Sequence, residues 1–545
     1  MFRPRDGNFF SAALAHFAIT ALAIGAVWWW LGAPAHLPPS PLANGGKLYC
    51  VSYGPFRDGQ DPLVEGTHVD PQQIDDDLTL VSRYTDCVRT YSIDNGQDQV
   101  AAIAQRHGMK VLQGILLSPK PDVNRRQIST VIALAKKYPD VIFAIVVGNE
   151  VLLRGDMSVS DLAATIREVK AQVSQPVTYA DVWEYWLRYS DLANAVDFVT
   201  IHILPYWEDF PLPASLAAAH VDEIRKKVAA AIPNKEIVVG EVGWPSEGRM
   251  REGARPSRSN QARVIEETVA LAQRENFRLN VIEAFDQPWK RQLEGATGGY
   301  WGIFDRDTRA PKFSFDGNVS DHPHWLLQAF AGILLAAFVF AGAGIAGRGK
   351  NAPPLLWLRI VALAFPPAVL FGWTIERLPI DSFTAGGWLR ALAFALTAAA
   401  APIACAAACA AGRGSPTFSA VFSRSAAARD ALSLALGLSL IALTVLSVQT
   451  ALGLVFDPRY RDIPFAPQSA AVIPFLMLMI SLPRKSEVST AGARAMAETV
   501  AAGVLALSAG YIAINETFAN WQAIWLCAGL LGLAVILRRA RDAPG

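Results

Sequence analysis

Two glutamates directly follow short apolar runs, and together they could act on a glycosidic bond. Glu150 ends the segment Val146–Glu150, and Glu241 ends the segment Ile237–Glu241. Continuous apolar runs of this length predict strands that are buried on both faces. Cleavage of a glycosidic bond needs one carboxyl group that protonates the leaving oxygen and another that attacks the anomeric carbon. Taken alone, either glutamate could instead form an ion pair at a strand end, Glu150 with Arg154 for example.

The elements that would position this pair form a repeating pattern between Gly46 and Ser320. Helical periodicity recurs between strand-like segments, for example over Asp161–Val173 and Asn260–Glu275. Eight β units that alternate with helices predict an α/β fold, a closed (β/α)8 barrel whose active site lies at the carboxyl ends of its strands. The eight segments are Lys47–Tyr53, Cys87–Tyr91, Lys110–Leu117, Val141–Gly148, Pro176–Ala180, Val196–Ile203, Glu236–Gly240 and Val281–Phe285. Glu150 and Glu241 would then project from the same rim.

Composition indicates that the barrel is only part of the protein. The chain has 545 residues, of which 52% are hydrophobic and only 18% charged, too apolar for a wholly soluble protein. Its net charge of +1 offers no general attraction for nucleic acid. We therefore expect a soluble domain joined to a membrane region, with no nucleic-acid partner.

The amino-terminal segment predicts a membrane anchor. Phe9–Leu31 is apolar, two arginines precede it, and the Pro-rich linker Pro34–Pro41 follows. A cleaved signal peptide is the alternative, because Ala33 and Ala35 resemble a small-residue cleavage site. A run of about 20 apolar residues is long enough to span a bilayer, which favours the anchor.

Seven further apolar spans follow the barrel, so about eight transmembrane helices are expected. They lie near Trp325–Ala346, Leu355–Thr374, Trp388–Ala411, Leu432–Val455, Phe465–Leu482, Thr499–Ile514 and Trp521–Leu537. The sixth and seventh of the eight are short. The predicted organisation is an anchor and linker over 1–45, an extracytoplasmic barrel over 46–320, a multispan region over 324–537 and a cytoplasmic tail over 538–545.

Basic residues predict the orientation of these spans. If the amino terminus lies inside, the loops and chain ends on the cytoplasmic side carry most of the Lys and Arg, as the positive-inside rule requires. That group holds Arg348, Lys350, Arg413, Arg424, Arg429, Arg484, Lys485, Arg494, Arg538, Arg539 and Arg541, against Arg377, Arg459 and Arg461 on the other side. The barrel then lies outside the cytoplasm.

Cysteine usage leaves one pairing open. Cys405, Cys409 and Cys527 fall in apolar spans, while Cys50 and Cys87 begin adjacent predicted strands of the soluble region. These two could form a disulfide in an oxidising compartment, or could remain two buried thiols.

Several motifs resemble glycoside hydrolase family 17, the family of β-1,3-glucanases and β-glucanosyltransferases. Asn149–Glu150 and Val239–Ser246 carry the resemblance, together with Val88–Ser92, Ile203–Tyr206 and Glu283–Lys290. The likeness covers about half the chain. It implies that Glu150 is the acid/base, that Glu241 is the nucleophile and that configuration is retained. Leu204 stands where plant-type members have a tyrosine, and His202 replaces an asparagine.

A set of polar and aromatic residues at the expected strand ends is predicted to bind substrate. The Asn149 amide suits a sugar 2-hydroxyl, and aromatic faces can stack on sugar rings. The set comprises Asn149, Tyr53, Arg89, Tyr91, His202, Tyr206, Trp207, Trp244, Asp286, Trp289 and Lys290. For the charged members, ion pairing within the rim is an alternative.

The multispan region is similar to that of bacterial family members linked to periplasmic β-1,3/β-1,6-glucans, including a rhizobial type described as a β-1,6-glucan synthase. This resemblance implies a bacterial inner-membrane protein with a periplasmic catalytic domain that transfers glucan to a sugar acceptor. Hydrolysis by water, as in an endo-1,3-β-glucanase, is the alternative within the same chemistry. A glucan-binding exporter or scaffold subunit is the alternative of another class.

We expect no metal or cofactor, and a separate glucan synthase as a possible partner. The histidines show no metal-ligand spacing. Gly342–Gly347 matches a dinucleotide-binding pattern, but it closes a predicted membrane span, so helix packing explains it better. The membrane half carries no acidic catalytic pair, so the glucan donor would be made by another protein.

Overall fold

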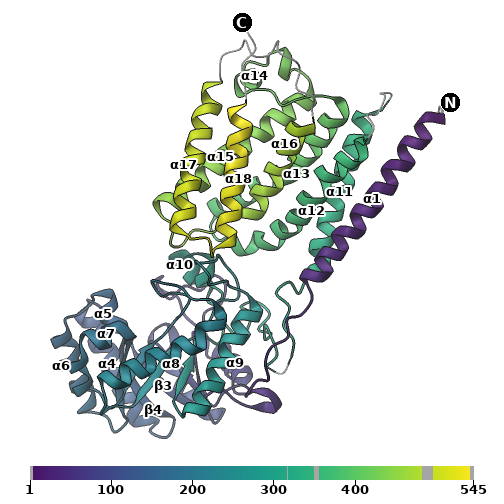
Figure 1. The fold of residues 1–545 in the computed structure, drawn as a ribbon. Helices are drawn as coiled ribbons and strands as arrows, with labels where there is room; N and C mark the ends of the chain where they lie inside the picture. Colours follow the sequence, from purple (N-terminus) through teal and green to yellow (C-terminus); the bar gives the residue numbers. More distant parts are fainter. Residues whose placement is uncertain (1–3, 316, 349–354, 482–494, 540–545) are drawn as a thin grey trace. The chain divides into compact units, whose positions relative to one another are not determined.

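The computed structural model describes residues 4–315, 317–348, 355–481 and 495–539 (Figure 1). The chain forms two compact units. One is Pro34–Val319, and the other combines Met1–Ala33 with Ser320–Gly545. The amino-terminal helix therefore belongs to the same unit as the helices at the carboxyl end of the chain. Most of the predicted tail over 538–545, and several of the basic residues used to orient the spans, lie outside the described residues.

Pro34–Val319 is built on a closed barrel of eight parallel strands in sequence order, which confirms the predicted (β/α)8 fold. The strands are β1 Cys50–Ser52, β2 Cys87–Arg89, β3 Lys110–Ile115, β4 Ile142–Asn149, β5 Val177–Val182, β6 Val199–His202, β7 Ile237–Val242 and β8 Leu279–Val281. Side chains from these strands are almost all buried, as their apolar composition requires.

Helices follow the strands and cover the barrel. They are α2 Pro71–Val81, α3 Val100–Arg106, α4 Pro121–Lys137, α5 Val151–Arg154, α6 Val159–Lys170, α7 Trp183–Arg188, α8 Ala214–Ala231, α9 Arg258–Glu275 and α10 Arg291–Gly298. Short 3-10 turns occur at η1 Ala43–Gly45, η2 Asp94–Gln99, η3 Ser190–Asn194 and η4 Pro288–Lys290. In α6, Ser158 caps the first turn, while Leu162, Ile166 and Val169 form the buried stripe.

The strand bounds differ from the predicted ones by a few residues, and the differences in β7 and β8 concern the site. β7 extends to Val242, so Glu241 lies within the strand rather than just after it. β8 begins and ends earlier than Val281–Phe285. Beyond it the Ala284 amide still donates to the Ser52 carbonyl of β1, and the chain also bonds to a later segment. There the Ile303 amide donates to the Glu283 carbonyl, and the Phe304 amide donates to the Ala284 carbonyl.

A disulfide joins Cys50 to Cys87, with 4.5 Å between their Cα atoms. Both cysteines are the first residues of their strands, and Val51 of β1 pairs with Val88 of β2. The link therefore ties two neighbouring strands at their amino ends, opposite the rim where a barrel active site forms.

The second unit is helical. Its elements are α1 Pro4–Leu31, α11 Trp325–Ala346, α12 Leu356–Asp381, α13 Ala385–Ala411, α14 Phe418–Phe422, η5 Ala426–Ala428, α15 Ala431–Phe456, α16 Phe465–Ser481, α17 Met496–Asn515 and α18 Trp521–Arg538. Among the described residues, seven helices are long and apolar enough to cross a membrane. The remaining expected span corresponds to α16, which has 17 described residues. These helices indicate a multi-pass membrane protein.

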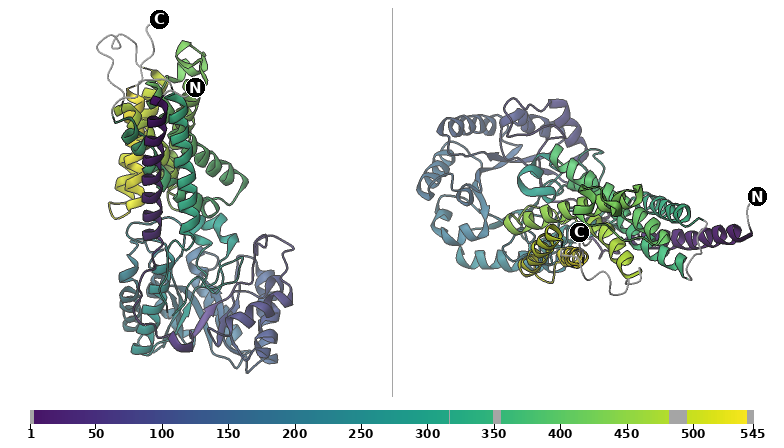
Figure 2. Two further views of the ribbon diagram at one scale, coloured as in Figure 1. Left: turned by 90° about the vertical axis from the view of Figure 1, so that its right-hand side faces the viewer. Right: turned by 90° about the horizontal axis from the view of Figure 1, so that it is seen from above.

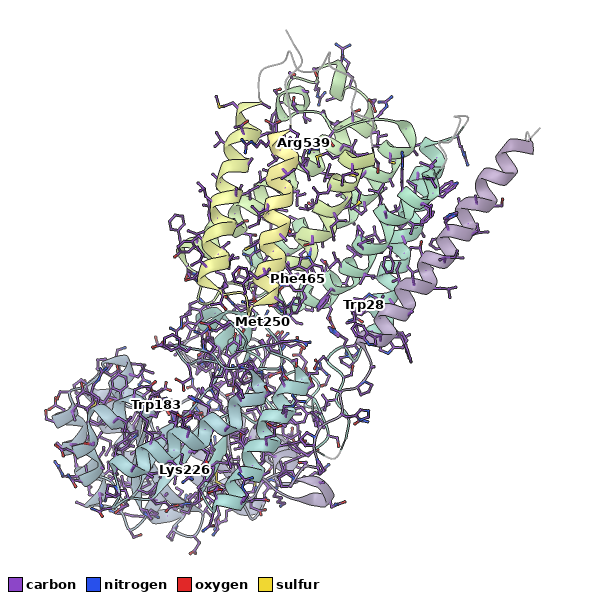
Figure 3. The ribbon with its side chains drawn as sticks, in the orientation of Figure 1. Trp28, Trp183, Lys226, Met250, Phe465 and Arg539 are labelled. Atoms are coloured by element: carbon purple, nitrogen blue, oxygen red, sulfur yellow. A yellow bond between two sulfur atoms is a disulfide. The ribbon has the colours of Figure 1, made fainter. Side chains whose placement is uncertain are left out.

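The long helices run side by side within this unit (Figure 2). α16 packs among α12, α13 and α18, and α1 packs against α11 and α12. α1 begins and α18 ends at the same end of the unit, while Trp28 and Phe465 lie near the opposite end from Arg539 (Figure 3). An aromatic group at the Trp28 end is typical of a membrane interface.

Candidate active site

Glu241 lies deep in the barrel mouth on β7, with only 5% of its side chain exposed. Its Oε1 atom accepts a hydrogen bond from Arg89 Nη1 at 2.6 Å and lies 2.9 Å from the Tyr91 hydroxyl. Burial would raise the pKa of Glu241, but the positive charges of His202, Arg89 and Lys290, together with the Tyr91 hydroxyl, hold it below its usual value. Glu241 is therefore held as a carboxylate, the form that a nucleophile needs.

Glu150 follows the last residue of β4 and is more open, with 24% of its side chain exposed. Its backbone is left-handed, with φ of 52°, an uncommon conformation for a residue with a side chain. Two residues of β5 hold the turn after it: the Leu152 amide donates to the Tyr179 hydroxyl at 3.0 Å, and the Leu153 amide to Asp181 at 3.4 Å. These buried polar groups thus hold the backbone of the turn that follows Glu150.

The two carboxylates face each other across the mouth. Carboxylate oxygens of Glu150 and Glu241, with a ring nitrogen of His202, all lie within 4.8 Å of one another. Retaining glycosidases place their carboxyl groups about 5 to 5.5 Å apart, whereas inverting enzymes need about 6.5 to 9.5 Å to admit a water molecule. The spacing in this barrel fits attack by one carboxylate while the other supplies the proton.

His202 lies between these carboxylates and is buried, with an exposed fraction of 1%. Its Nδ1 is 3.0 Å from Glu150 Oε1, and its Nε2 is 3.5 Å from Glu241 Oε1. A register shift in the β6–β7 pairing sets His202 opposite Glu241. His202 was predicted to bind substrate; in the structure it is buried and contacts the two carboxylates.

The cluster of Glu150, His202 and Glu241 has the spacing of a metal site, but its surroundings do not fit a cation. The Arg89 guanidinium already occupies the face of Glu241 at 2.6 Å and is itself buried. A second positive charge placed against the same oxygen would be repelled by this guanidinium. We derive no step through a metal ion.

Arg89 also links Glu241 to Asn149. Its Nη2 donates to the Asn149 Oδ1, while Nη1 reaches Glu241 and the Gly240 carbonyl. With its oxygen engaged, Asn149 has its amide NH2 left to donate to a sugar hydroxyl. Arg89 was predicted to touch substrate, but it is only 1% exposed and acts from beneath the mouth.

Glu283 is a site residue that the sequence interpretation missed, although the segment that contains it was noted. It is buried and pairs with Lys290, whose Nζ lies 3.1 Å and 3.0 Å from its two oxygens. Burial raises the pKa of Glu283 to about 7 although Lys290 lowers it. The apolar residues around Glu283 suggested a strand core, and no feature of its spacing indicated a role at the rim.

Tyr53 and Asp286 do not line the mouth as predicted. Both are fully buried. The Tyr53 hydroxyl donates to Asp77 at 3.1 Å, and Asp286 accepts from Lys312 at 2.6 Å. The Tyr53 hydroxyl and Asp286 Oδ1 are thus engaged with groups inside the protein.

Two predicted aromatic contacts are also internal. Tyr206 and Trp244 are fully buried, and their ring centroids lie 5.9 Å apart in an edge-to-face contact. Trp207 is less buried, stacks on Trp301 with 15° between the ring planes and carries the Arg251 guanidinium 5.3 Å from its ring centroid. Tyr206 and Trp244 therefore form the base that supports Trp207.

Five of the predicted residues remain partly accessible: Asn149, Tyr91, Trp207, Trp289 and Lys290. The Trp289 indole donates to Gln287 at 2.9 Å, which fixes the plane of its ring. Burial and the charge of Glu241 raise the pKa of Tyr91 well above its ordinary value, so its hydroxyl keeps its proton. These residues can supply donors and ring faces to a ligand.

Comparison with known proteins gives a consistent result for this unit. Residues 50–302 match the protein family described as the BtgE/BtgC glycoside hydrolase domain. The chain is 28% identical to the glucan 1,3-beta-glucosidase of Arthroderma benhamiae over 278 residues, which cover 47% of this chain and 88% of that protein. It is 26% identical to the probable beta-glucosidase btgE of Aspergillus oryzae, over 49% of this chain and 44% of that protein.

Among solved structures, the chain is similar to the glycoside hydrolase family 17 β-1,3-glucanosyltransferase of Rhizomucor miehei. The two are 23% identical, with a TM-score of 0.45, over 50% of this chain and 99% of the other. The matched family covers the barrel and its rim, where Glu150 and Glu241 face each other. Residues 50–302 therefore resemble the BtgE/BtgC glycoside hydrolase domain, which makes this unit a glycosidase acting on O-glycosyl bonds.

Proposed function

We propose that this protein cleaves β-1,3-glucan with retention of configuration and transfers the released glucan to a sugar acceptor. The observation that carries the proposal is the facing pair of carboxylates, whose nearest oxygens lie within 4.8 Å, with the Arg89 guanidinium on one member and His202 between them. The curated relatives supply the substrate class, since one is named a glucan 1,3-beta-glucosidase.

In the first half-reaction, Glu241 attacks the anomeric carbon while Glu150 protonates the leaving oxygen. The contacts from Arg89, Tyr91 and His202 all fall on Glu241 Oε1, which leaves Oε2 as the attacking oxygen. Glu150 is the more exposed carboxyl, as the group that must reach the glycosidic oxygen should be. The product is a covalent glycosyl-enzyme.

In the second half-reaction, Glu150 removes a proton from the incoming hydroxyl, and that oxygen displaces Glu241. Water and a sugar hydroxyl use the same chemistry, so binding of the acceptor decides between hydrolysis and transfer. The partly exposed Trp207 and Trp289 offer ring faces of the kind that hold a sugar acceptor. An endo-1,3-β-glucanase that uses water is the runner-up within this mechanism.

We infer that the protein resides in a bacterial inner membrane with its barrel in the periplasm. Residues 1–45 would form the membrane anchor and linker, and 46–320 the periplasmic enzyme domain. Residues 324–537 would form the multispan membrane region, and 538–545 a cytoplasmic tail. Arginines near the ends of α13 and α18, including Arg413, Arg538 and Arg539, support an inside position for those ends. The Cys50–Cys87 disulfide fits an oxidising compartment.

A glucan-binding scaffold or exporter subunit is the candidate of another class. A domain that only binds glucan has no need for a nucleophile held ionised by Arg89. The site therefore favours an enzyme, with a separate synthase as the source of its glucan.

Product analysis tests the proposal. Full-length protein in detergent is incubated with laminari-oligosaccharides of defined length, and product size and linkage are determined by mass spectrometry and NMR. Products longer than the substrate support transfer, and only shorter products support the hydrolase. No turnover in wild-type protein, with binding intact, would support the scaffold.

A further inference from the structure

His202 contacts both proposed catalytic carboxylates, yet the two half-reactions above assign it no step. Its Nδ1 is within hydrogen-bonding distance of Glu150 Oε1, at 3.0 Å. Its Nε2 has no hydrogen-bond partner and faces Glu241 Oε1 at 3.5 Å. The ring is thus hydrogen-bonded to Glu150, the proposed acid/base, and its other nitrogen faces Glu241, the proposed nucleophile.

The space around the ring is closed. His202 is 1% exposed, so water does not compete for its nitrogens. Gly240 of β7 provides the room, since a Cβ at that position would lie 3.2 Å from the His202 Cδ2 and 2.3 Å from Thr200 Cγ2. The imidazole is therefore confined to one orientation between the two strands that flank it.

Charged groups lie around the mouth in which this ring is buried, and Glu150, Asp181 and Glu241 are those that interact with the ring itself. Negative groups outnumber positive ones among them: Glu150 after β4, Asp181 on β5, Glu241 on β7, Glu283 after β8 and Glu294 on α10, against Arg89 on β2 and Lys290 on η4. The imidazole is thus in direct reach of two carboxylates, Glu150 at 3.0 Å and Glu241 at 3.5 Å.

We propose that His202 holds the proton that Glu150 delivers to the leaving oxygen, so that the imidazole and the carboxyl act as one proton-carrying pair. This inference rests on the proposed function. His202 does not touch substrate and is a positioning residue that acts through Glu150.

The proton balance closes over one cycle. As the glycosidic C–O bond breaks, the leaving oxygen takes a proton from Glu150, and Glu150 takes the Nδ1 proton from the imidazolium. The carboxylate Oε2 of Glu241 forms the new bond to the anomeric carbon. In the second half-reaction the acceptor hydroxyl gives its proton to Glu150, which returns it to Nδ1 as the acceptor oxygen displaces Glu241.

The consequence is a wider working range toward high pH. An imidazole ordinarily keeps its proton to a pH about two units above that of a glutamate carboxyl. A pair that stores its proton on an imidazole therefore keeps that proton over those two pH units. Without the ring, the acid function depends on the carboxyl of Glu150 alone.

The first test compares pH profiles of kcat/KM on laminari-oligosaccharides for full-length wild-type protein and His202→Asn. Asparagine keeps a hydrogen-bond donor but cannot store a proton. We expect the alkaline limb to move toward acid by about one to two units, with a loss of about ten- to a hundredfold at pH 7. His107→Asn is the matched control, because His107 also pairs with a carboxylate, Asp75 at 2.9 Å, but precedes β3 at the opposite end of the barrel. Superimposable wild-type and His202→Asn limbs would overturn the proposal.

The second test removes the need for a proton. An aryl β-laminaribioside with a dinitrophenyl leaving group departs without protonation, so the first half-reaction no longer requires the stored proton. We expect kcat/KM of His202→Asn on this substrate to stay within about threefold of wild type. An equal loss on both substrates would mean that His202 only supports the fold.

Two further readouts keep the outcomes distinct. If His202→Asn fails to fold, as judged by circular dichroism, His202→Gln replaces it in both tests, since it too carries an amide. A wild-type protein that cleaves neither substrate would refute the proposed function itself. A wild-type protein that cleaves both, with an unshifted variant profile, would refute only the role of His202.

Discussion

Replacement of Arg89 should cost the barrel a large part of its stability. The Arg89 guanidinium and the Glu241 carboxylate are 2.6 Å apart, and their side chains are 1% and 5% exposed. At an effective dielectric constant of about 20, the attraction between two such charges is about 6 kcal/mol. Desolvation offsets part of that attraction, but removing one partner leaves the other charge buried and unpaired. We expect Arg89→Met to lower the free energy of unfolding by about 3 to 5 kcal/mol at pH 7.

The assay is thermal unfolding of the full-length protein, followed through tryptophan fluorescence. In a domain of this size, 1 kcal/mol corresponds to about 2 to 4 °C, so the barrel transition should fall by roughly 6 to 20 °C. The matched variant is Arg89→Met with Glu241→Gln, which removes both charges. Its melting temperature should fall by much less than the sum of the falls in the two single variants. A single variant within about 2 °C of wild type, or strictly additive losses, would refute the reasoning.

The same pair predicts a pH dependence. The pKa of Glu241 is depressed in the folded protein, so its contribution to stability is present above the value in the unfolded chain and is lost as pH falls through the folded value. The difference in melting temperature between wild type and Arg89→Met should therefore shrink on acidification. A difference that stays constant from neutral to strongly acidic pH would contradict this assignment.

Three further predictions concern the surroundings of the site. Because the pKa of Glu283 is raised to about 7, its ionisation costs stability as pH rises from about 4.5 to about 7, and Glu283→Gln should flatten that fall in a melting series; an unchanged slope would argue against it. Asp181→Asn should lower kcat and leave KM nearly unchanged, because the turn that follows Glu150 loses a buried carboxylate partner. Steady-state kinetics tests this, and a change in KM alone would contradict it. Cys50→Ser removes a disulfide between positions 37 apart and should lower the free energy of unfolding by about 4 kcal/mol on a chain-entropy basis. Melting of the variant and of the oxidised wild type under non-reducing conditions tests this, and the reduced wild type should melt like the variant.

The barrel and its catalytic pair could be predicted because both depend on local pattern. Alternating strand-like and helical segments imply parallel strands, and Glu150 and Glu241 follow two of them at the same edge. The disulfide remained open because adjacency of strands does not decide whether Cys50 and Cys87 are oxidised. The structure joins them.

The finer features depend on register and on the direction of side chains. His202 faces Glu241 because of an irregularity in the β6–β7 pairing, which no sequence period reveals. Tyr53 and Trp244 follow strands, as residues of a cleft do, but loops fold over them and bury both rings.

The configuration of the first product tests the central claim most directly. Full-length protein is mixed with laminari-oligosaccharides, and NMR follows the anomeric protons of the newly formed glycosidic bonds, together with those of any reducing ends released by water, before mutarotation. We expect the β-anomer to appear first, and we expect Glu241→Gln to abolish its formation while substrate binding persists. Initial release of the α-anomer, or unchanged product formation by Glu241→Gln, would contradict it.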